Sequence, residues 1–95
     1  MTQRLLNTVP ALNIDDGGTG SDCVLFVHSL AGNCGHWSHQ LDHLRQNQRA
    51  LALDLRGHGL SSPAPDGDYS ISSLAKDIES AAEALHLHKF FLVGH

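Results

Sequence analysis

A formal net charge of −4 on 95 residues, with only six lysines and arginines, argues against a partner such as nucleic acid or an anionic membrane. The length allows one small domain. Residues 1–14 contain one arginine and a single pair of consecutive leucines, which is the pattern of neither a secretory signal nor a membrane-spanning helix. Cys23 and Cys34 match no zinc or redox spacing, so we expect two buried thiols and a cytoplasmic location.

The N-terminal part of the sequence predicts two short strands and a turn. Residues 4–9 and 11–14 form the strands on either side of Pro10, which suits the edge of a sheet because proline has no N–H to donate. Residues 15–20, Asp-Asp-Gly-Gly-Thr-Gly, are turn formers and predict a hairpin turn.

Two uninterrupted apolar runs follow, at residues 23–27 and 50–53. Residues 23–27 show no polar alternation, so this strand is expected to be buried on both faces, as in a parallel sheet. Between the two runs, Trp37, Leu41 and Leu44 recur at helical spacing and predict a short amphipathic helix that ends near residue 46.

A loop and a second helix lead to the last strand. Residues 55–68 contain three glycines and two prolines and therefore predict a loop. Apolar residues from Ile71 to Leu85 trace one helical stripe, with Ser70 or Ser72 as the N-cap. The final apolar run, at residues 90–93, predicts another strand.

This order, a β-hairpin followed by β-α-β-α-β, predicts an α/β fold with a mostly parallel sheet and flanking helices. We expect the sheet to be incomplete, because its last and most apolar strand has no successor and leaves an open edge. Only two helices are available to cover two faces. The 95 residues alone are therefore expected to aggregate or to stay unfolded.

Three segments that follow predicted strands carry a family pattern. They are residues 27–33 (V-H-S-L-A-G-N), 54–61 (D-L-R-G-H-G-L-S) and 93–95 (V-G-H). Together they resemble the α/β-hydrolase family, in which an H-G-x-x-G oxyanion loop, a D-x-R-G-H-G-x-S loop and a G-H-S-x-G nucleophile turn follow the third, fourth and fifth strands. The resemblance implies that residues 1–95 are the N-terminal part of a single hydrolase domain. The nucleophile helix, lid, acid and base are then expected outside these residues.

The resemblance also implies a role for the loop after the first apolar run. Acyl transfer builds negative charge on a carbonyl oxygen, and backbone N–H groups aimed at this oxygen stabilise it. The N–H of Leu30 is implied as one such donor, while His28 and Ser29 shape the turn. The family usually has glycine where Ser29 stands. A side chain at this position is expected to alter the path of the loop.

The implied nucleophile is the residue directly after His95, with Gly94 and His95 flanking it. We expect a serine, because Ala31 stands where the Asp-dependent epoxide hydrolases and dehalogenases commonly have proline, and Leu30 offers no side-chain donor. The implied activity is hydrolysis of a carboxylic ester, thioester, lactone or small amide, without a cofactor. An Asp-nucleophile enzyme of the same fold and a non-catalytic binding protein are the alternatives.

Residues 54–61 are interpreted as architectural, with a local ion pair between Asp54 and Arg56. Their glycines nearly match a dinucleotide-binding fingerprint. Pro63 and Pro65 follow, however, so no helix can begin there and bind a pyrophosphate with its N-terminus.

Two further features lie in the first predicted helix. His36, His39 and His43 fall roughly on one face, but their neighbours are polar and solvent-facing, so we expect no bound metal. Trp37 is interpreted mainly as a core residue near the oxyanion loop, with lining of a pocket there as the alternative.

Overall fold

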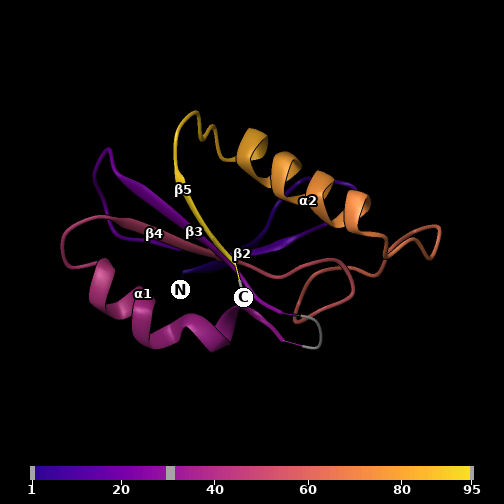
Figure 1. The fold of residues 1–95 in the computed structure, drawn as a ribbon, viewed down its shortest axis with the longest axis horizontal. Coiled ribbons are helices and arrows are strands. Elements are labelled where there is room, and N and C mark those ends of the chain that lie inside the picture. The colour runs from indigo at the N-terminus through magenta and orange to yellow at the C-terminus, as the bar shows by residue number, and fades with distance from the viewer. Residues whose placement is uncertain (1, 30–31, 95) are drawn as a thin grey trace.

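Strands and helices alternate along the chain in the predicted order. The computed structural model describes residues 2–29 and 32–94. Its elements are β1 (Gln3–Leu5), β2 (Asn13–Gly17), β3 (Cys23–Val27), the 3-10 helix η1 (Cys34–Trp37), α1 (Ser38–Leu44), β4 (Arg49–Leu53), α2 (Ile71–Ala84) and β5 (Phe91–Gly94). The described strands form one sheet of order β1-β2-β4-β3-β5, with α1 and α2 on opposite faces (Figure 1).

The parallel part of the sheet consists of β4, β3 and β5. β3 pairs in parallel with both neighbours, and the register places Leu53 of β4 and Gly94 of β5 beside Val27 of β3. The carboxyl ends of the three strands therefore lie in one row. The loops that follow β3 and β4 leave the sheet at the same edge, where α/β folds bind their ligands.

The N-terminal hairpin differs from the predicted one. β1 and β2 pair antiparallel, and the strands predicted at residues 4–9 and 11–14 are shifted to Gln3–Leu5 and Asn13–Gly17. The predicted hairpin turn at residues 15–20 is wrong, because β2 continues to Gly17 and pairs with β4 rather than with β3.

Tertiary contacts explain why these turn-forming residues are extended. Arg45 bonds the carboxylate of Asp15 at 2.8 Å, and Arg49 bonds both carboxylate oxygens of Asp16, at 3.0 and 2.8 Å. Asp16 also pairs with Leu51 across the sheet. The ion pairs and the strand register together override the local turn preference.

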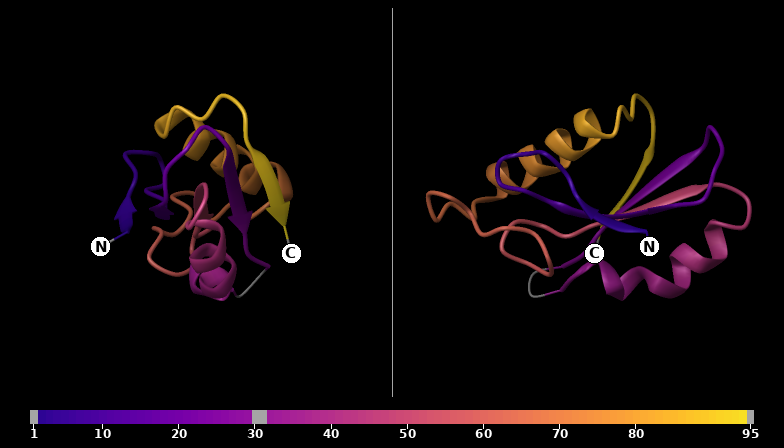
Figure 2. Two further views of the ribbon diagram at one scale, coloured as in Figure 1. Left: turned by 90° about the vertical axis from the view of Figure 1, so that its left-hand side faces the viewer. Right: turned by 180° about the vertical axis from the view of Figure 1, so that it is seen from behind.

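β3 and β4 are buried on both faces, as predicted for a parallel sheet. Successive side chains of a strand point to opposite faces. One face packs Leu25, Leu51 and Leu53 with Ala81 and Leu85 at the end of α2, and the other packs Phe26, Ala50 and Ala52 with Leu41 of α1. Figure 2 shows the sheet between these two helical layers.

Side-chain caps begin α2 and the 3-10 helix η1, whereas α1 has no side-chain cap of its own. Ser70 caps α2, because its Oγ accepts the N–H of Ser73. The helix predicted from Trp37 is divided in two: η1 begins after Asn33, whose side chain accepts the N–H of Gly35, and α1 continues from it to Leu44.

β5 lies at the open edge of the described sheet, as predicted. Phe91, Leu92 and Val93 are 70%, 55% and 37% exposed. Among residues 2–29 and 32–94, β5 pairs with β3 on one side and with no strand on the other. No helix in the described residues is long and apolar enough to cross a membrane.

Candidate active site

An open pocket of about 360 Å³ lies where the chain leaves β3. Its lining residues are His28, Ser29, His36, Trp37 and Gln40. The first two follow β3 directly, and the others belong to η1 and α1. The structure therefore brings the predicted site residues His28, Ser29 and Trp37 together around one hollow.

His28 is 3% exposed and uses both ring nitrogens. Its Nε2 lies 3.0 Å from the backbone nitrogen of Leu55, and its Nδ1 lies 2.7 Å from the carbonyl oxygen of Ser29. An amide N–H can only donate and a carbonyl can only accept, so Nε2 is unprotonated and Nδ1 carries the hydrogen. Burial lowers the pKa of His28 below 6.5, although the Ser29 carbonyl opposes that shift.

The ring of His28 also contacts the loop that follows β4. The ring centroids of His28 and His58 are 5.0 Å apart, with the planes tilted by 46°. His58 is held in turn by a 2.8 Å hydrogen bond between its Nδ1 and the carbonyl oxygen of Arg56. A positive charge on His58 would disfavour protonation of His28, so this contact also lowers the pKa of His28.

The carbonyl oxygen of Ser29 accepts two hydrogen bonds. The His28 ring supplies one, and the N–H of Gly32, at 2.9 Å, supplies the other. The second bond joins the two residues on either side of positions 30 and 31. Leu30 and Ala31, at the centre of this segment, lie outside the described residues, so the implied oxyanion donor is not located.

Trp37 has both of the roles considered from the sequence. Its ring lies 4.7 Å from that of Phe26, centroid to centroid, and it packs against the core on the α1 face. It also lines the pocket beside His28 and Ser29.

Asp54 organises the loop after β4 from a buried position. Its carboxylate accepts the backbone N–H of Cys34 at 2.6 Å, the side-chain amide of Asn13 at 2.9 Å and the backbone N–H of Leu60 at 3.0 Å. These bonds tie the loop to β2 and to the segment after β3. This arrangement agrees with the architectural role that the sequence indicates for residues 54–61.

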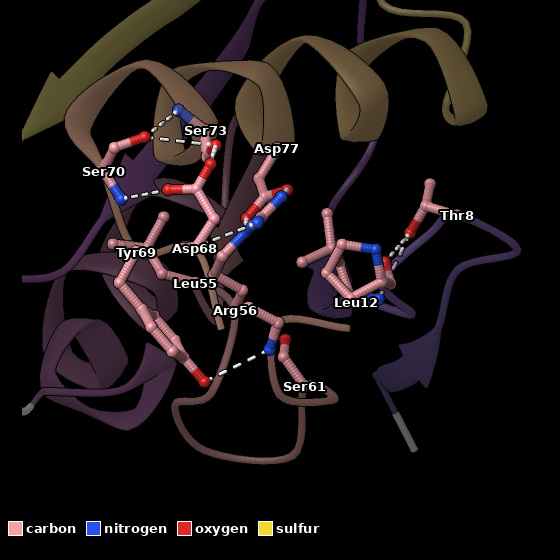
Figure 3. Close-up of polar contacts among 12 residues, drawn as sticks. Thr8, Leu12, Leu55, Arg56, Ser61, Asp68, Tyr69, Ser70, Ser73 and Asp77 are labelled. Atoms are coloured by element: carbon pink, nitrogen blue, oxygen red, sulfur yellow. Dashed lines mark hydrogen bonds and ion pairs between the residues drawn. The ribbon is translucent and has the colours of Figure 1, made fainter. Parts of the chain in front are cut away.

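The predicted ion pair between Asp54 and Arg56 is wrong. Arg56 instead pairs with Asp77 of α2 through two hydrogen bonds of 2.8 Å, and both side chains are buried (Figure 3). This pairing raises the pKa of Arg56. Three N–H donors already occupy both carboxylate oxygens of Asp54.

A second carboxylate fixes the chain at the start of α2. Asp68 accepts the N–H of Ser70 at 2.9 Å and the hydroxyl of Ser73 at 2.6 Å, and its backbone carbonyl accepts Arg56 at 2.9 Å (Figure 3). The bonds from the two serines lower the pKa of Asp68 to about 2. The loop 55–68 is thus anchored to α2 at both of its ends.

The remaining predicted site residues are only partly placed. Gly94 ends β5 beside Val27, whereas His95 lies outside the described residues. Of the three helix histidines, His36 lines the pocket. Residues 2–29 and 32–94 contain no group of three histidine, cysteine, aspartate or glutamate side chains that could hold a metal ion.

Comparison with known proteins agrees with this architecture. A family model described as the alpha/beta hydrolase fold matches residues 22–95. The chain is 30% identical to epoxide hydrolase 2 of Caenorhabditis elegans over 83 residues, which are 86% of this chain and 23% of that protein. It is 37% identical to a serine hydrolase-like protein of Danio rerio over 73 residues, which are 76% of this chain and 22% of that protein.

Solved structures show the same fold. The crystal structure of the epoxide hydrolase VrEH1 from Vigna radiata superimposes with a TM-score of 0.87 at 31% identity, over 98% of this chain and 31% of that one. The chain belongs to the α/β-hydrolase fold family. It spans about a quarter of the length of the curated relatives it matches.

Proposed function

We propose that residues 1–95 are the N-terminal part of a hydrolase domain that cleaves a carboxylic ester or a related acyl substrate through a serine nucleophile directly after His95. The observation that carries the proposal is the alignment of Leu53, Val27 and Gly94 in one row of the parallel sheet. A residue that follows β5 would leave the sheet beside the turn that begins with His28 and Ser29. A nucleophile and an oxyanion donor must lie this close to act on one carbonyl group.

The proposed chemistry is acyl transfer in two steps. The serine Oγ attacks the substrate carbonyl while a histidine removes its proton, and an aspartate orients that histidine. The negative charge that develops on the carbonyl oxygen is stabilised by the N–H of Leu30 and by the N–H of the residue after the nucleophile. The histidine and aspartate are assigned to the remainder of the domain, which the reaction requires.

The pocket favours an uncharged acyl group. Of the described residues that line it, none is aspartate, glutamate, lysine or arginine, and Trp37 provides an apolar wall. The described lining residues offer a charged substrate group no aspartate, glutamate, lysine or arginine as an ionic partner. We therefore assign a small, neutral ester, thioester, lactone or amide as the substrate class.

The second candidate is an epoxide hydrolase with an aspartate nucleophile. It is favoured by relatives with that name, including those from Caenorhabditis elegans and Vigna radiata. Against it stands Ala31, at the position where such enzymes commonly have proline. A non-catalytic member of the family would have glycine or alanine after His95.

Two buried, free thiols support a cytoplasmic location for the protein, because such thiols persist in a reducing compartment.

The activity itself is tested on the complete protein with p-nitrophenyl acetate, before and after treatment with a serine-directed phosphonate. We expect turnover that the phosphonate abolishes. Turnover of an epoxide such as styrene oxide, without sensitivity to the phosphonate, would support the second candidate instead.

A further inference from the structure

A basic pocket of about 290 Å³ lies at the edge of the sheet opposite the candidate active site. Four basic side chains line it, one from the start of β4 and three from the segment between α2 and β5: Arg49, His86, His88 and Lys89. No aspartate or glutamate among the described residues lines it. On a chain with a formal net charge of −4, a pocket whose charged lining is entirely basic indicates recognition of an anion.

The length of β3 separates this pocket from the candidate active site. Cys23, the first residue of the strand, lines the basic pocket, whereas His28, the residue after its end, lines the other. A strand rises about 3.3 Å per residue, so Cys23 and Val27 lie roughly 13 Å apart along it. A ligand in the basic pocket therefore leaves the candidate active site open.

The positive charges at the basic pocket are not fully balanced within the described residues. Arg49 donates Nε and Nη2 to the carboxylate of Asp16, at 3.0 and 2.8 Å, and Arg4 pairs with the same carboxylate at 3.3 Å. Lys89 forms no ion pair with a described carboxylate. Asp22 lines an adjoining pocket with Lys89 and balances one of the two surplus charges. One positive charge is then left for an external anion.

The backbone of His86 provides an independent observation. Its φ is +57°, and among the described residues it is the one non-glycine residue with a positive φ. A helix that ends in this conformation usually has glycine there, because a side chain strains the backbone. Ala82 and Glu83 of α2 already accept the N–H groups of Leu87 and His86. The helix end is thus closed by backbone bonds, and the imidazole lines the basic pocket.

We propose that the basic pocket binds the phosphate group of a small soluble molecule. A phosphate monoester carries close to two negative charges near pH 7 and three strong acceptor oxygens. Lys89 offers three N–H donors, each imidazole offers at least one, and Nη1 of Arg49 makes no hydrogen bond to a described residue. A carboxylate, with one charge and two oxygens, would use fewer of these donors.

Calorimetric titration of the complete protein with inorganic phosphate tests the site. We expect saturable binding that Lys89→Gln weakens roughly tenfold or more, because a charged donor is lost. Lys76→Gln is the matched control, since it removes the other lysine of the 95 residues, at an exposed position of α2, and should leave the affinity unchanged. Absence of binding, or equal affinity in the two variants, would overturn the inference.

His86→Gly separates binding from stability. Glycine adopts a φ of +57° without strain, so the thermal midpoint should stay the same or rise. The affinity for phosphate should fall, because an N–H donor of the pocket is lost. Unchanged affinity would overturn the inference. A loss of both stability and affinity would also overturn it, because His86 would then serve the helix end rather than the anion.

Further titrations identify the kind of ligand. Inorganic phosphate should bind more tightly than acetate at equal ionic strength. Binding of the protein to vesicles that contain phosphatidic acid, without binding of soluble phosphate, would indicate a membrane surface and overturn the inference.

The phosphate site and the proposed function can fail separately. Hydrolysis of p-nitrophenyl acetate should continue in saturating phosphate, because the two pockets lie at opposite ends of β3. Competition between phosphate and the ester would place the phosphate in the candidate active site and overturn this inference. Phosphate binding without ester turnover would contradict the proposed function alone.

Discussion

The backbone N–H of Cys34 lies 2.6 Å from the Oδ1 atom of the Asp54 carboxylate. This hydrogen bond connects the segment after β3 to the first residue after β4. Asp54 is 1% exposed, and its second oxygen accepts Asn13 and Leu60. One carboxylate therefore holds together three segments that are far apart in the sequence.

Replacing Asp54 with alanine should destabilise the complete protein strongly. Three N–H donors would lose their partner, two of them in buried surroundings, and we expect a loss of about 4 kcal/mol in the free energy of unfolding. Chemical denaturation measures this loss. Asp42→Ala, at an exposed position of α1, is the control and should change stability by less than about 0.5 kcal/mol. Similar values for the two variants would contradict the role of Asp54.

The carboxylate of Asp54 leaves no room for a side chain at position 59, where the chain has glycine. The φ of Gly59 is +51°, and a Cβ built on it would collide with the carboxylate of Asp54. Gly67 has a φ of +71° but no atom within 4 Å of such a Cβ. We expect Gly67→Ala to cost about 1 kcal/mol from backbone strain alone and Gly59→Ala to cost about 3 kcal/mol or more. Equal losses of the free energy of unfolding in the two variants would show that the Asp54 carboxylate can move away from the added Cβ at little cost.

The buried pair of Arg56 and Asp77 should show strong coupling. Removing one partner leaves an uncompensated buried charge, so Arg56→Met and Asp77→Leu are each expected to cost about 3–5 kcal/mol. The double variant should cost less than the sum of the two, and a double-mutant cycle measures the difference. Additive losses would indicate that the two side chains act independently.

Much of the fold follows from apolar patterning. The uninterrupted runs at residues 23–27 and 50–53 predict strands, the first of them buried on both faces, and β3 and β4 both have that environment. The stripe from Ile71 to Leu85 predicts α2 with Ser70 or Ser72 as its cap, and the structure has Ser70 there. These apolar patterns lie within single segments, and burial of their side chains stabilises the predicted elements directly.

The parts that failed depend on contacts between distant segments. The strand order, with β4 between β2 and β3, and the extension of Asp15 and Asp16 come from pairing that no local pattern encodes. Asp77 offered a signal, because it stands one turn from Leu74 and Ala81 on the apolar face of α2, where a carboxylate needs a partner. Its partner Arg56 could not be chosen over the nearer Asp54–Arg56 pairing without the fold.

The buried imidazole of His28 should make stability depend on pH. Burial lowers its pKa below 6.5, with His58 and His36 adding to that shift and Ser29 and Asp54 opposing it. The unfolded chain then binds a proton at a higher pH than the folded one. The free energy of unfolding should therefore fall as pH drops below 6.5 and level off below the folded pKa.

Denaturation of wild type and His28→Gln between about pH 8 and about pH 5 tests this dependence, because the two proteins differ only in this side chain. The wild type should lose more stability than the variant across that range. Parallel curves would show that His28 titrates alike in the folded and unfolded states.

Peptide mapping of the phosphonate adduct locates the proposed serine nucleophile. The complete protein is labelled with a serine-directed fluorophosphonate and digested, and the modified residue is located by mass spectrometry. We expect one label per molecule, on a serine directly after His95. A label on another residue, or an unmodified peptide across this position in protein that hydrolyses its substrate, would contradict it.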